Sequence, residues 1–182
     1  MRELSLNILD VTENSLRAGA TLVTIDVDVT EQTITIRIAD NGCGMSADFL
    51  ARVTDPFTTT RTTRKVGMGL PLIKMEAEMS GGTFDITSTP NVGTTVTTTF
   101  DTQHIDRPPI GNLAESIVAL LPDLGDTRLI FSYRAFGQNF TLDTDEVKQQ
   151  LDGVPLSTPE VLVFLKEMTE ENITTINGGI VL

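Results

Sequence analysis

The segment Asp40-Asn41-Gly42-Cys43-Gly44-Met45 ends a run of alternating apolar residues with a carboxylate and two glycines. Gly42 and Gly44 can adopt positive backbone dihedrals, and they leave space that a side chain would fill. A carboxylate such as Asp40 only accepts hydrogen bonds, and an adenine amino group is a suitable donor. Because acidic glycine turns close many strands without binding anything, the surrounding motifs decide what this segment does.

The composition indicates one main domain with a sizeable core and an appended tail, since 40% of the 182 residues are hydrophobic. A formal net charge of -12 disfavours attraction to nucleic acid and to anionic membranes. The sequence has one cysteine, no bilayer-spanning apolar run and no signal-peptide pattern, so we expect a cytoplasmic protein with neither nucleic-acid nor membrane partners. It lacks the cysteine and histidine cluster of a structural zinc site.

Hydrophobic periodicity predicts alternating helices and strands, hence an α/β fold, in the first hundred residues. The expected helices span residues 3–18, 45–53 and 67–80, and the expected strands span residues 22–29, 34–38, 83–88 and 94–100. Residues 54–66 are polar and threonine-rich, which is typical of a mobile loop.

A proline-rich junction, His104-Ile105-Asp106-Arg107-Pro108-Pro109, predicts a domain of residues 1–101 and a small α+β extension of residues 102–182. The extension is expected to contain helices near 113–121, 144–151 and 159–171, strands near 128–133 and 138–142, and a frayed end or edge strand from Thr174. It could dock a partner or form a homodimer, although a packing extension is the simplest interpretation.

A polar stripe runs along the first helix, where Asp10, Glu13, Asn14 and Arg17 lie three or four residues apart. On an isolated helix this pattern describes a solvated face with ordinary ion pairs. Because this stripe precedes the Asp40 segment in the sequence, it could instead form part of the same binding site.

In their order along residues 1–101, these segments resemble the GHKL superfamily, the Bergerat-fold ATPases that include histidine kinases, gyrase-type topoisomerases and mismatch-repair ATPases. Residues 13–21 resemble the N box, whose asparagine, Asn14 here, holds the magnesium ion that bridges the nucleotide phosphates. Asp40 would receive the adenine amino group. Thr94, in Gly93-Thr94-Thr95, would lie near the adenine.

Two further segments resemble histidine kinases in particular. Asp55-Pro56-Phe57 resembles the aromatic box before their lid, and Gly67-Met68-Gly69-Leu70 resembles their lid-closing glycine motif. Amides at the start of a helix favour a negatively charged phosphate, which supports the second assignment. In the loop between them, Arg61, Arg64 and Lys65 would counter phosphate charge after closure.

The resemblance implies ATP and Mg²⁺ as ligands and a two-layer α/β sandwich of the Bergerat type. The expected ATP-binding residues are Asn14, Arg17, Asp40, Gly42, Gly44, Met45, Arg61, Lys65, Gly67, Met68, Gly69, Leu70 and Thr94. Asn14 is also the expected metal ligand, because magnesium prefers hard oxygen donors.

Each motif also has a purely structural interpretation. Gly67 and Gly69 could start a tightly packed helix, and the loop cations could face solvent. Thr94 could be an ordinary strand threonine, and Phe57 is best interpreted as a core aromatic. The joint order of the motifs favours the nucleotide interpretation.

Asp10 is the candidate general base, because ATPases of this superfamily place a carboxylate four residues before the magnesium asparagine. An aspartate is one methylene shorter than the usual glutamate, so it needs a shifted water or backbone; a magnesium-site carboxylate is the alternative role. Glu13, about 100° around the helix, is the poorer candidate. Arg17 and the glycine motif resemble histidine kinases more than mismatch-repair ATPases.

His104 is the single histidine, and its place in the junction favours a structural role. We therefore expect ATP hydrolysis, or phosphoryl transfer in trans to a partner protein, as in the anti-sigma-factor serine kinases that resemble this domain. The alternative is a non-catalytic regulatory module in which ATP orders residues 54–66 and alters a partner surface.

Overall fold

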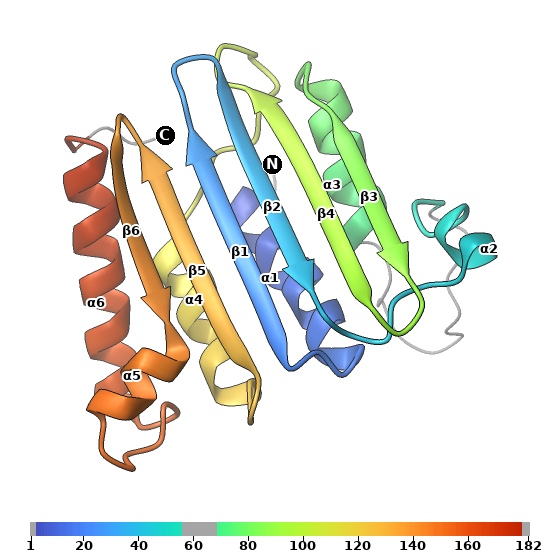
Figure 1. The fold of residues 1–182 in the computed structure, drawn as a ribbon. Coiled ribbons are helices and arrows are strands. Elements are labelled where there is room, and N and C mark those ends of the chain that lie inside the picture. Colours follow the sequence, from blue (N-terminus) through green and yellow to red (C-terminus); the bar gives the residue numbers. More distant parts are fainter. Residues whose placement is uncertain (1–2, 56–68, 180–182) are drawn as a thin grey trace.

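The fold is built on a six-stranded sheet in the computed structural model, which describes residues 3–55 and 69–179 (Figure 1). The strands are β1 (Leu22–Val29), β2 (Thr33–Asp40), β3 (Phe84–Thr89), β4 (Gly93–Asp101), β5 (Arg128–Ala135) and β6 (Gln138–Asp143). The helices are α1 (Leu4–Arg17), α2 (Ala47–Leu50), α3 (Gly69–Met79), α4 (Leu113–Leu120), α5 (Thr144–Gln150) and α6 (Pro159–Ile176), and a 3-10 turn spans Leu121–Asp123.

One face of the sheet carries the helices, so the predicted two-layer α/β fold is confirmed. Helices α1, α3 and α4 lie behind the sheet, and α6 runs beside β6 and packs against α4 (Figure 1). In β1, Val23, Ile25 and Val27 are buried against the helices, whereas the intervening residues alternate to the open face. A sheet with one covered face requires this period of two.

The strand order is β3-β4-β2-β1-β5-β6, and it explains why the Asp40 segment meets the β3–β4 turn. The predicted hairpin of β1 and β2 is confirmed, and β2 pairs with β4 so that Asp40 lies opposite Thr94. The last two strands attach on the other side, where β5 runs parallel to β1 after a crossover through α4.

The tail contributes β5 and β6 to the same sheet and also contacts the first helix. The first amides of α1, which have no partner within the helix, are those of Leu4 and Ser5. They donate to the carbonyls of Pro109 and Ile110 over 3.0 and 2.8 Å. The division at residue 101 stays a prediction, but these bonds place the tail against the helix that carries Asn14.

The largest differences from the predicted boundaries are in two helices, α2 and α6. The helix expected within residues 45–53 covers Ala47–Leu50, where the Ser46 hydroxyl accepts a hydrogen bond from the Phe49 amide. The frayed end or edge strand expected from Thr174 is wrong at its start, because α6 continues through Ile176, whose side chain is buried in the core. The predicted loop lies, apart from its first two residues, outside the described residues.

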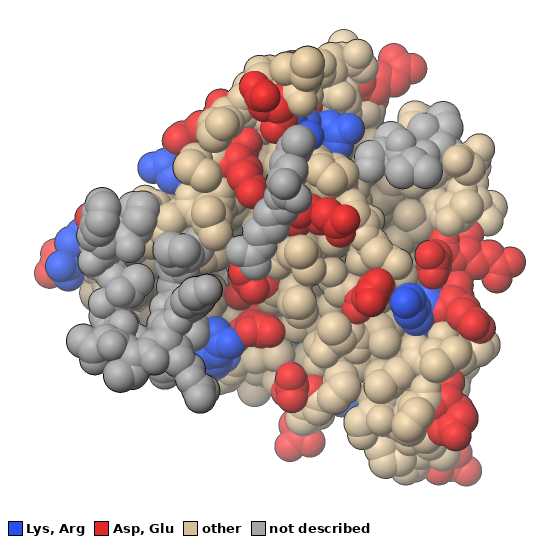
Figure 2. All heavy atoms as spheres, turned by 180° about the vertical axis from the view of Figure 1, so that it is seen from behind, with Lys and Arg blue, Asp and Glu red and all other residues tan. Residues whose placement is uncertain are grey.

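Acidic side chains are spread over the helix-covered face, and basic ones are visible at fewer points (Figure 2). This matches the formal net charge of -12 for the whole chain. Within residues 3–55 and 69–179, no helix has both the length and the apolar character needed to cross a membrane.

Candidate functional site

Asp40, at the end of β2, is held by donors from three different segments. Its Oδ2 accepts from the Ser15 hydroxyl at 2.7 Å, and its Oδ1 accepts from the amides of Gly42 at 2.9 Å and Thr94 at 3.3 Å. A carboxylate offers about four acceptor positions, two on each oxygen. Oδ1 therefore uses both of its positions in these bonds, and Oδ2 keeps one for a donor such as an adenine amino group.

The two glycines after Asp40 are each required for a different steric reason. Gly44 has φ of +64°, and a Cβ there would lie 2.0 Å from the Thr89 carbonyl oxygen. Gly42 does not use its freedom to adopt positive φ; it is required because a Cβ there would lie 2.9 Å from that of Ala18. The turn thus packs closely between the end of α1 and the β3–β4 turn. This packing fixes the direction of the Asp40 side chain.

Ser88 connects Met45 to Thr94 and fixes the direction of the threonine hydroxyl. Its Oγ accepts from the Met45 amide at 2.8 Å, lies 3.0 Å from the Gly93 carbonyl and is 2.9 Å from Thr94 Oγ1. If the single Ser88 proton is donated to the Gly93 carbonyl, the Thr94 hydroxyl must donate to Ser88. Both predicted residues, Met45 and Thr94, therefore belong to the wall beside Asp40.

The polar stripe of α1 brings Asn14 and Arg17 together. Arg17 donates to Asn14 Oδ1 at 3.3 Å, and its other terminal nitrogen lies 2.5 Å from Glu13 Oε2. The guanidinium therefore occupies the oxygen that the resemblance assigns to magnesium. Because the Arg17–Glu13 pair is exposed, an exchange of Glu13 for another anion as the partner of Arg17 would cost little free energy.

The start of α3 lies against the same stripe. A Cβ on Gly69 would lie 3.2 Å from that of Asp10 and 4.0 Å from Asn14 Nδ2, so the absence of a side chain at Gly69 permits the approach. The first amides of a helix carry partial positive charge. Leu70 packs against the core, which leaves its backbone as the part that could contact a ligand.

A polar contact farther along α1 and α3 links the same two helices. The Asn7 side-chain amide, which is fully buried, donates to the carboxylate of Glu76. Gly69 meets Asp10 and Asn14 at one end of this helix pair, and Glu76 meets Asn7 at the other. The two helices are therefore held in a defined antiparallel register.

Several predicted site residues lie outside the described residues and have no structural assignment here. They are Arg61, Arg64, Lys65, Gly67 and Met68, together with Phe57 of the aromatic box. The remaining predicted residues form two groups at the same end of the molecule. Asp40, Gly42, Gly44, Met45 and Thr94 form one group, and Asp10, Asn14, Arg17, Gly69 and Leu70 form the other.

Sequence reasoning missed Ser15 and Asn7. Ser15 is 4% exposed and follows Leu4, Ile8 and Val11 on the apolar face of α1, at the spacing of a core residue. A polar residue at a core position must find a hydrogen-bond partner. The polar residue at a core position was therefore the signal in the sequence that could have identified Ser15. It did not identify the partner, which lies 25 residues away for Ser15 and 69 residues away for Asn7.

The residues present fit a magnesium ion that takes most of its ligands from a nucleotide. Across the described ranges, no group of three His, Cys, Asp or Glu side chains could hold a metal. Asn14 Oδ1 is a hard oxygen donor, and magnesium commonly combines one or two protein ligands with phosphate oxygens and waters.

Comparison with known proteins identifies the family that the first part of the chain matches. Residues 1–104 match the family described as histidine kinase-, DNA gyrase B-, and HSP90-like ATPase. The "Non-motile and phage-resistance protein" of Caulobacter vibrioides is 32% identical over 115 residues, or 59% of this chain. The "Heme sensor protein HssS" of Staphylococcus saprophyticus is 36% identical over 90 residues, or 48% of the chain. The "Autoinducer 2 sensor kinase/phosphatase LuxQ" of Vibrio harveyi is 28% identical over 139 residues, or 68% of the chain.

The matched segments are small parts of these relatives. They cover 14% of the Caulobacter protein, 20% of the staphylococcal protein and 16% of the Vibrio protein. The family match itself extends over more than half of the 182 residues. The chain belongs to the family of histidine kinase-, DNA gyrase B- and HSP90-like ATPases.

Proposed function

We propose that this chain binds ATP together with Mg²⁺ and that Asp40 recognises the adenine. The observation that carries the proposal is the remaining acceptor position on Asp40 Oδ2, beside bonds from Ser15, Gly42 and Thr94. The 6-amino group of adenine can donate there, whereas the 6-carbonyl of guanine, at the same ring position, only accepts hydrogen bonds. The proposal therefore includes a preference for ATP over GTP.

The phosphates are assigned to the α1–α3 side, where Asn14 lies against Gly69. Asn14 would hold magnesium, which supplies charge neutralisation at the phosphates when it is bound. The amides at the start of α3 would face the phosphate oxygens. Arg17 would exchange the Glu13 carboxylate for phosphate, because a phosphate that carries more charge is the stronger partner.

A phosphoryl group would pass to another protein molecule. His104 follows the far end of β4, and the eight residues from Thr94 to Asp101, which are separated by seven steps of about 3.3 Å, extend about 23 Å. Its Nδ1 accepts the Asp106 amide at 3.2 Å, as expected of a turn residue. This separation supports transfer in trans rather than to the chain's own histidine.

Asp10 is the proposed base for hydrolysis or transfer, since it lies on the phosphate side of the site against Gly69. The second candidate function is ATP-gated partner binding without turnover. The short aspartate side chain favours it, because a water in line with the phosphate must come closer to α1 than with glutamate.

Steady-state phosphate release with Mg²⁺ and ATP separates the two functions. For the enzyme, Asp10→Asn should lower release at least tenfold and keep ATP binding, and Asn14→Ala should weaken both. Glu13→Gln, the adjacent carboxylate on the same helix, serves as the matched control and should retain release. Release that persists in both site variants would indicate a contaminant, and binding without release, even with partners present, would establish the gated module.

A further inference from the structure

An open groove lies in the tail, about 460 Å³ in volume, between α5, β6 and α6. Its lining is mainly apolar and includes Leu142, Val147, Leu151, Val161, Phe164 and Met168. Phe164 is 61% exposed, although exposure of an aromatic ring to water is unfavourable. We call this hollow the β6-edge groove.

The groove follows the outer side of β6. Four consecutive residues, Phe140 to Asp143, line it. Since successive side chains of a strand point to opposite faces, a hollow touching four in a row runs along the strand's edge. In the described parts of the chain β6 pairs with β5 alone and ends the sheet. Such an edge presents backbone donors and acceptors to an additional strand.

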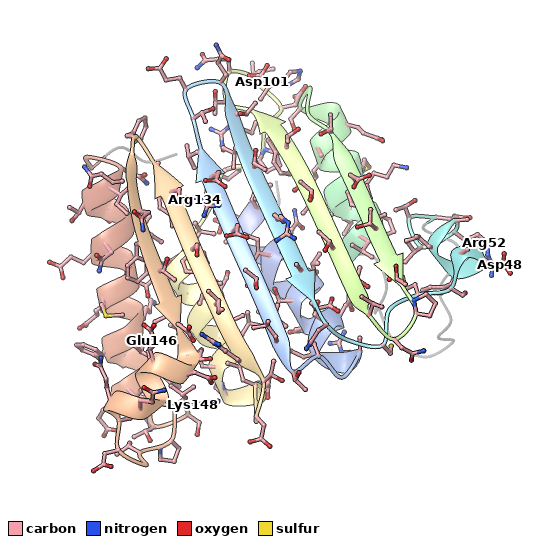
Figure 3. All side chains as sticks on the ribbon, in the orientation of Figure 1. Asp48, Arg52, Asp101, Arg134, Glu146 and Lys148 are labelled. Atoms are coloured by element: carbon pink, nitrogen blue, oxygen red, sulfur yellow. The ribbon has the colours of Figure 1, made fainter. Side chains whose placement is uncertain are left out.

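The charged groups of the groove are acidic. Glu146 and Glu160 line it from the first turns of α5 and α6, and no Lys or Arg is among the lining residues. Among the described residues neither carboxylate forms an ion pair. The nearby Lys148 instead lies 3.9 Å from Asp145; Glu146 and Lys148 are both labelled on α5 in Figure 3.

We propose that the β6-edge groove binds an extended segment of a partner protein, with apolar side chains at alternate positions and Lys or Arg beside them. Backbone hydrogen bonds to β6 would supply the pairing, and the apolar lining would receive every second side chain. Glu146 and Glu160 select basic flanks. A second copy of this chain fits poorly, because each copy carries a formal charge of -12.

The test is a selection from a random 12-residue peptide library against the full chain without nucleotide. Enriched peptides should combine alternating apolar positions with Lys or Arg, and synthetic copies should bind in a fluorescence polarisation titration. Glu146→Gln with Glu160→Gln should weaken that binding about three- to tenfold at low salt. Failure to enrich any peptide, or enrichment without basic positions, would overturn the proposal.

A matched pair of variants on α6 locates the site. Phe164→Asp places a charge in the groove and should weaken peptide binding more than tenfold, whereas Val163→Asp, at a 56% exposed position outside the lining, should not. Equal effects of the two variants would contradict the placement.

Backbone N-methylation of the peptide tests the extended conformation. Methylation at one set of alternate residues should abolish binding, and methylation at the other set should be tolerated. Loss at both sets would exclude strand addition. A dimer in sedimentation equilibrium that Phe164→Asp dissociates would show a second copy as the occupant and overturn the proposal. Because nucleotide is absent throughout, these results do not depend on ATP binding.

Discussion

The Ser15 hydroxyl lies 2.7 Å from Asp40 Oδ2 and joins the buried face of α1 to the end of β2. The neighbouring residue on the same helix is Asn14, the proposed magnesium ligand. In the proposed site, one turn of α1 would therefore position the adenine side through Ser15 and the phosphate side through Asn14. A change in the orientation of this helix would alter both ends of the nucleotide together.

Ser15→Ala is expected to lower the affinity for ATP roughly tenfold, because a hydrogen bond to a charged group contributes on the order of 1.5–3 kcal/mol and two other donors still hold Asp40. Calorimetric titration measures the change. Thr12→Val is the matched control: it removes a fully buried hydroxyl from the same helix, and that hydroxyl has no partner among the described residues. If both variants bind ATP like the wild type, Ser15 does not position Asp40.

The Asn7–Glu76 contact provides a second test, of the register between α1 and α3. Asn7→Asp sets two carboxylates against each other and should weaken MgATP binding about tenfold or more, since Gly69 would move relative to Asn14. Adenosine, which has no phosphates, should bind with unchanged affinity. Titrations with the two ligands, beside thermal unfolding without ligand, separate misplacement from general destabilisation.

Glu76→Gln combined with Asn7→Asp restores one donor and one acceptor with reversed polarity, and it should recover most of the lost MgATP affinity. An equal loss for adenosine and MgATP would indicate a merely structural role for the pair. Absence of MgATP binding in the wild type would instead refute the proposed function.

Substitutions at Gly44 and Gly19 distinguish two causes of destabilisation, which are backbone strain and steric overlap. Both have positive φ, +64° and +73°, but a Cβ at Gly19 meets nothing within 4 Å, whereas one at Gly44 meets the Thr89 carbonyl. Gly19→Ala should lower the free energy of unfolding by about 1–2 kcal/mol, and Gly44→Ala by at least about 2 kcal/mol more. Urea unfolding measures both, and equal losses would show that the Asp40 turn relaxes away from Thr89.

Asp143 should make the stability of the chain depend on acidity. A hydrogen bond from Arg128 is the main cause that holds the pKa of this carboxyl below its ordinary value of 3.8, and the Asp145 amide adds to the effect. A lowered folded pKa stabilises the fold above the unfolded pKa, and this stabilisation is lost as the pH falls through the folded value. The contribution therefore begins to decline below about pH 4 and decreases further as the pH falls through the lowered folded pKa.

Asp143→Asn keeps an N-cap for α5 and removes the charge. Its free energy of unfolding should be lower than that of the wild type at pH 7, and the gap should narrow toward pH 2. Glu160→Gln, at an exposed position of α6 with no such partner among the described residues, provides the comparison. A gap that stays constant with pH would exclude a role for the Asp143 charge.

The sequence predicted most elements because their periodicity is local. Alternation in residues 22–29 and 34–38 predicted β1 and β2, and the Asp40 segment after them predicted the turn. In the structure, Asp40 of this segment accepts hydrogen bonds from Ser15 and Thr94. The parallel pairing of β1 with β5 was not predicted. Its register joins Leu22 to Arg128, and nothing in either strand alone specifies a neighbour so distant in sequence.

The same limit applies to the candidate site. Motif order predicted that Asn14, Asp40 and Gly69 belong together, but not the buried polar residues that orient them. Ser15 and Asn7 find partners on other elements, so their role follows from packing and not from spacing along α1. The continuation of α6 to Ile176 likewise depends on burial of that side chain against the core.

The most direct test of nucleotide recognition is calorimetric titration of the wild type and Asp40→Asn with MgATP. The wild type should bind one equivalent of MgATP and should not bind MgGTP under the same conditions. Asp40→Asn should bind MgATP at least tenfold more weakly while unfolding at nearly the same temperature without ligand, because the substitution replaces acceptor capacity with a donor. Equal affinity of the two proteins, or no binding by the wild type, would contradict the assignment of Asp40 as the adenine-recognising residue.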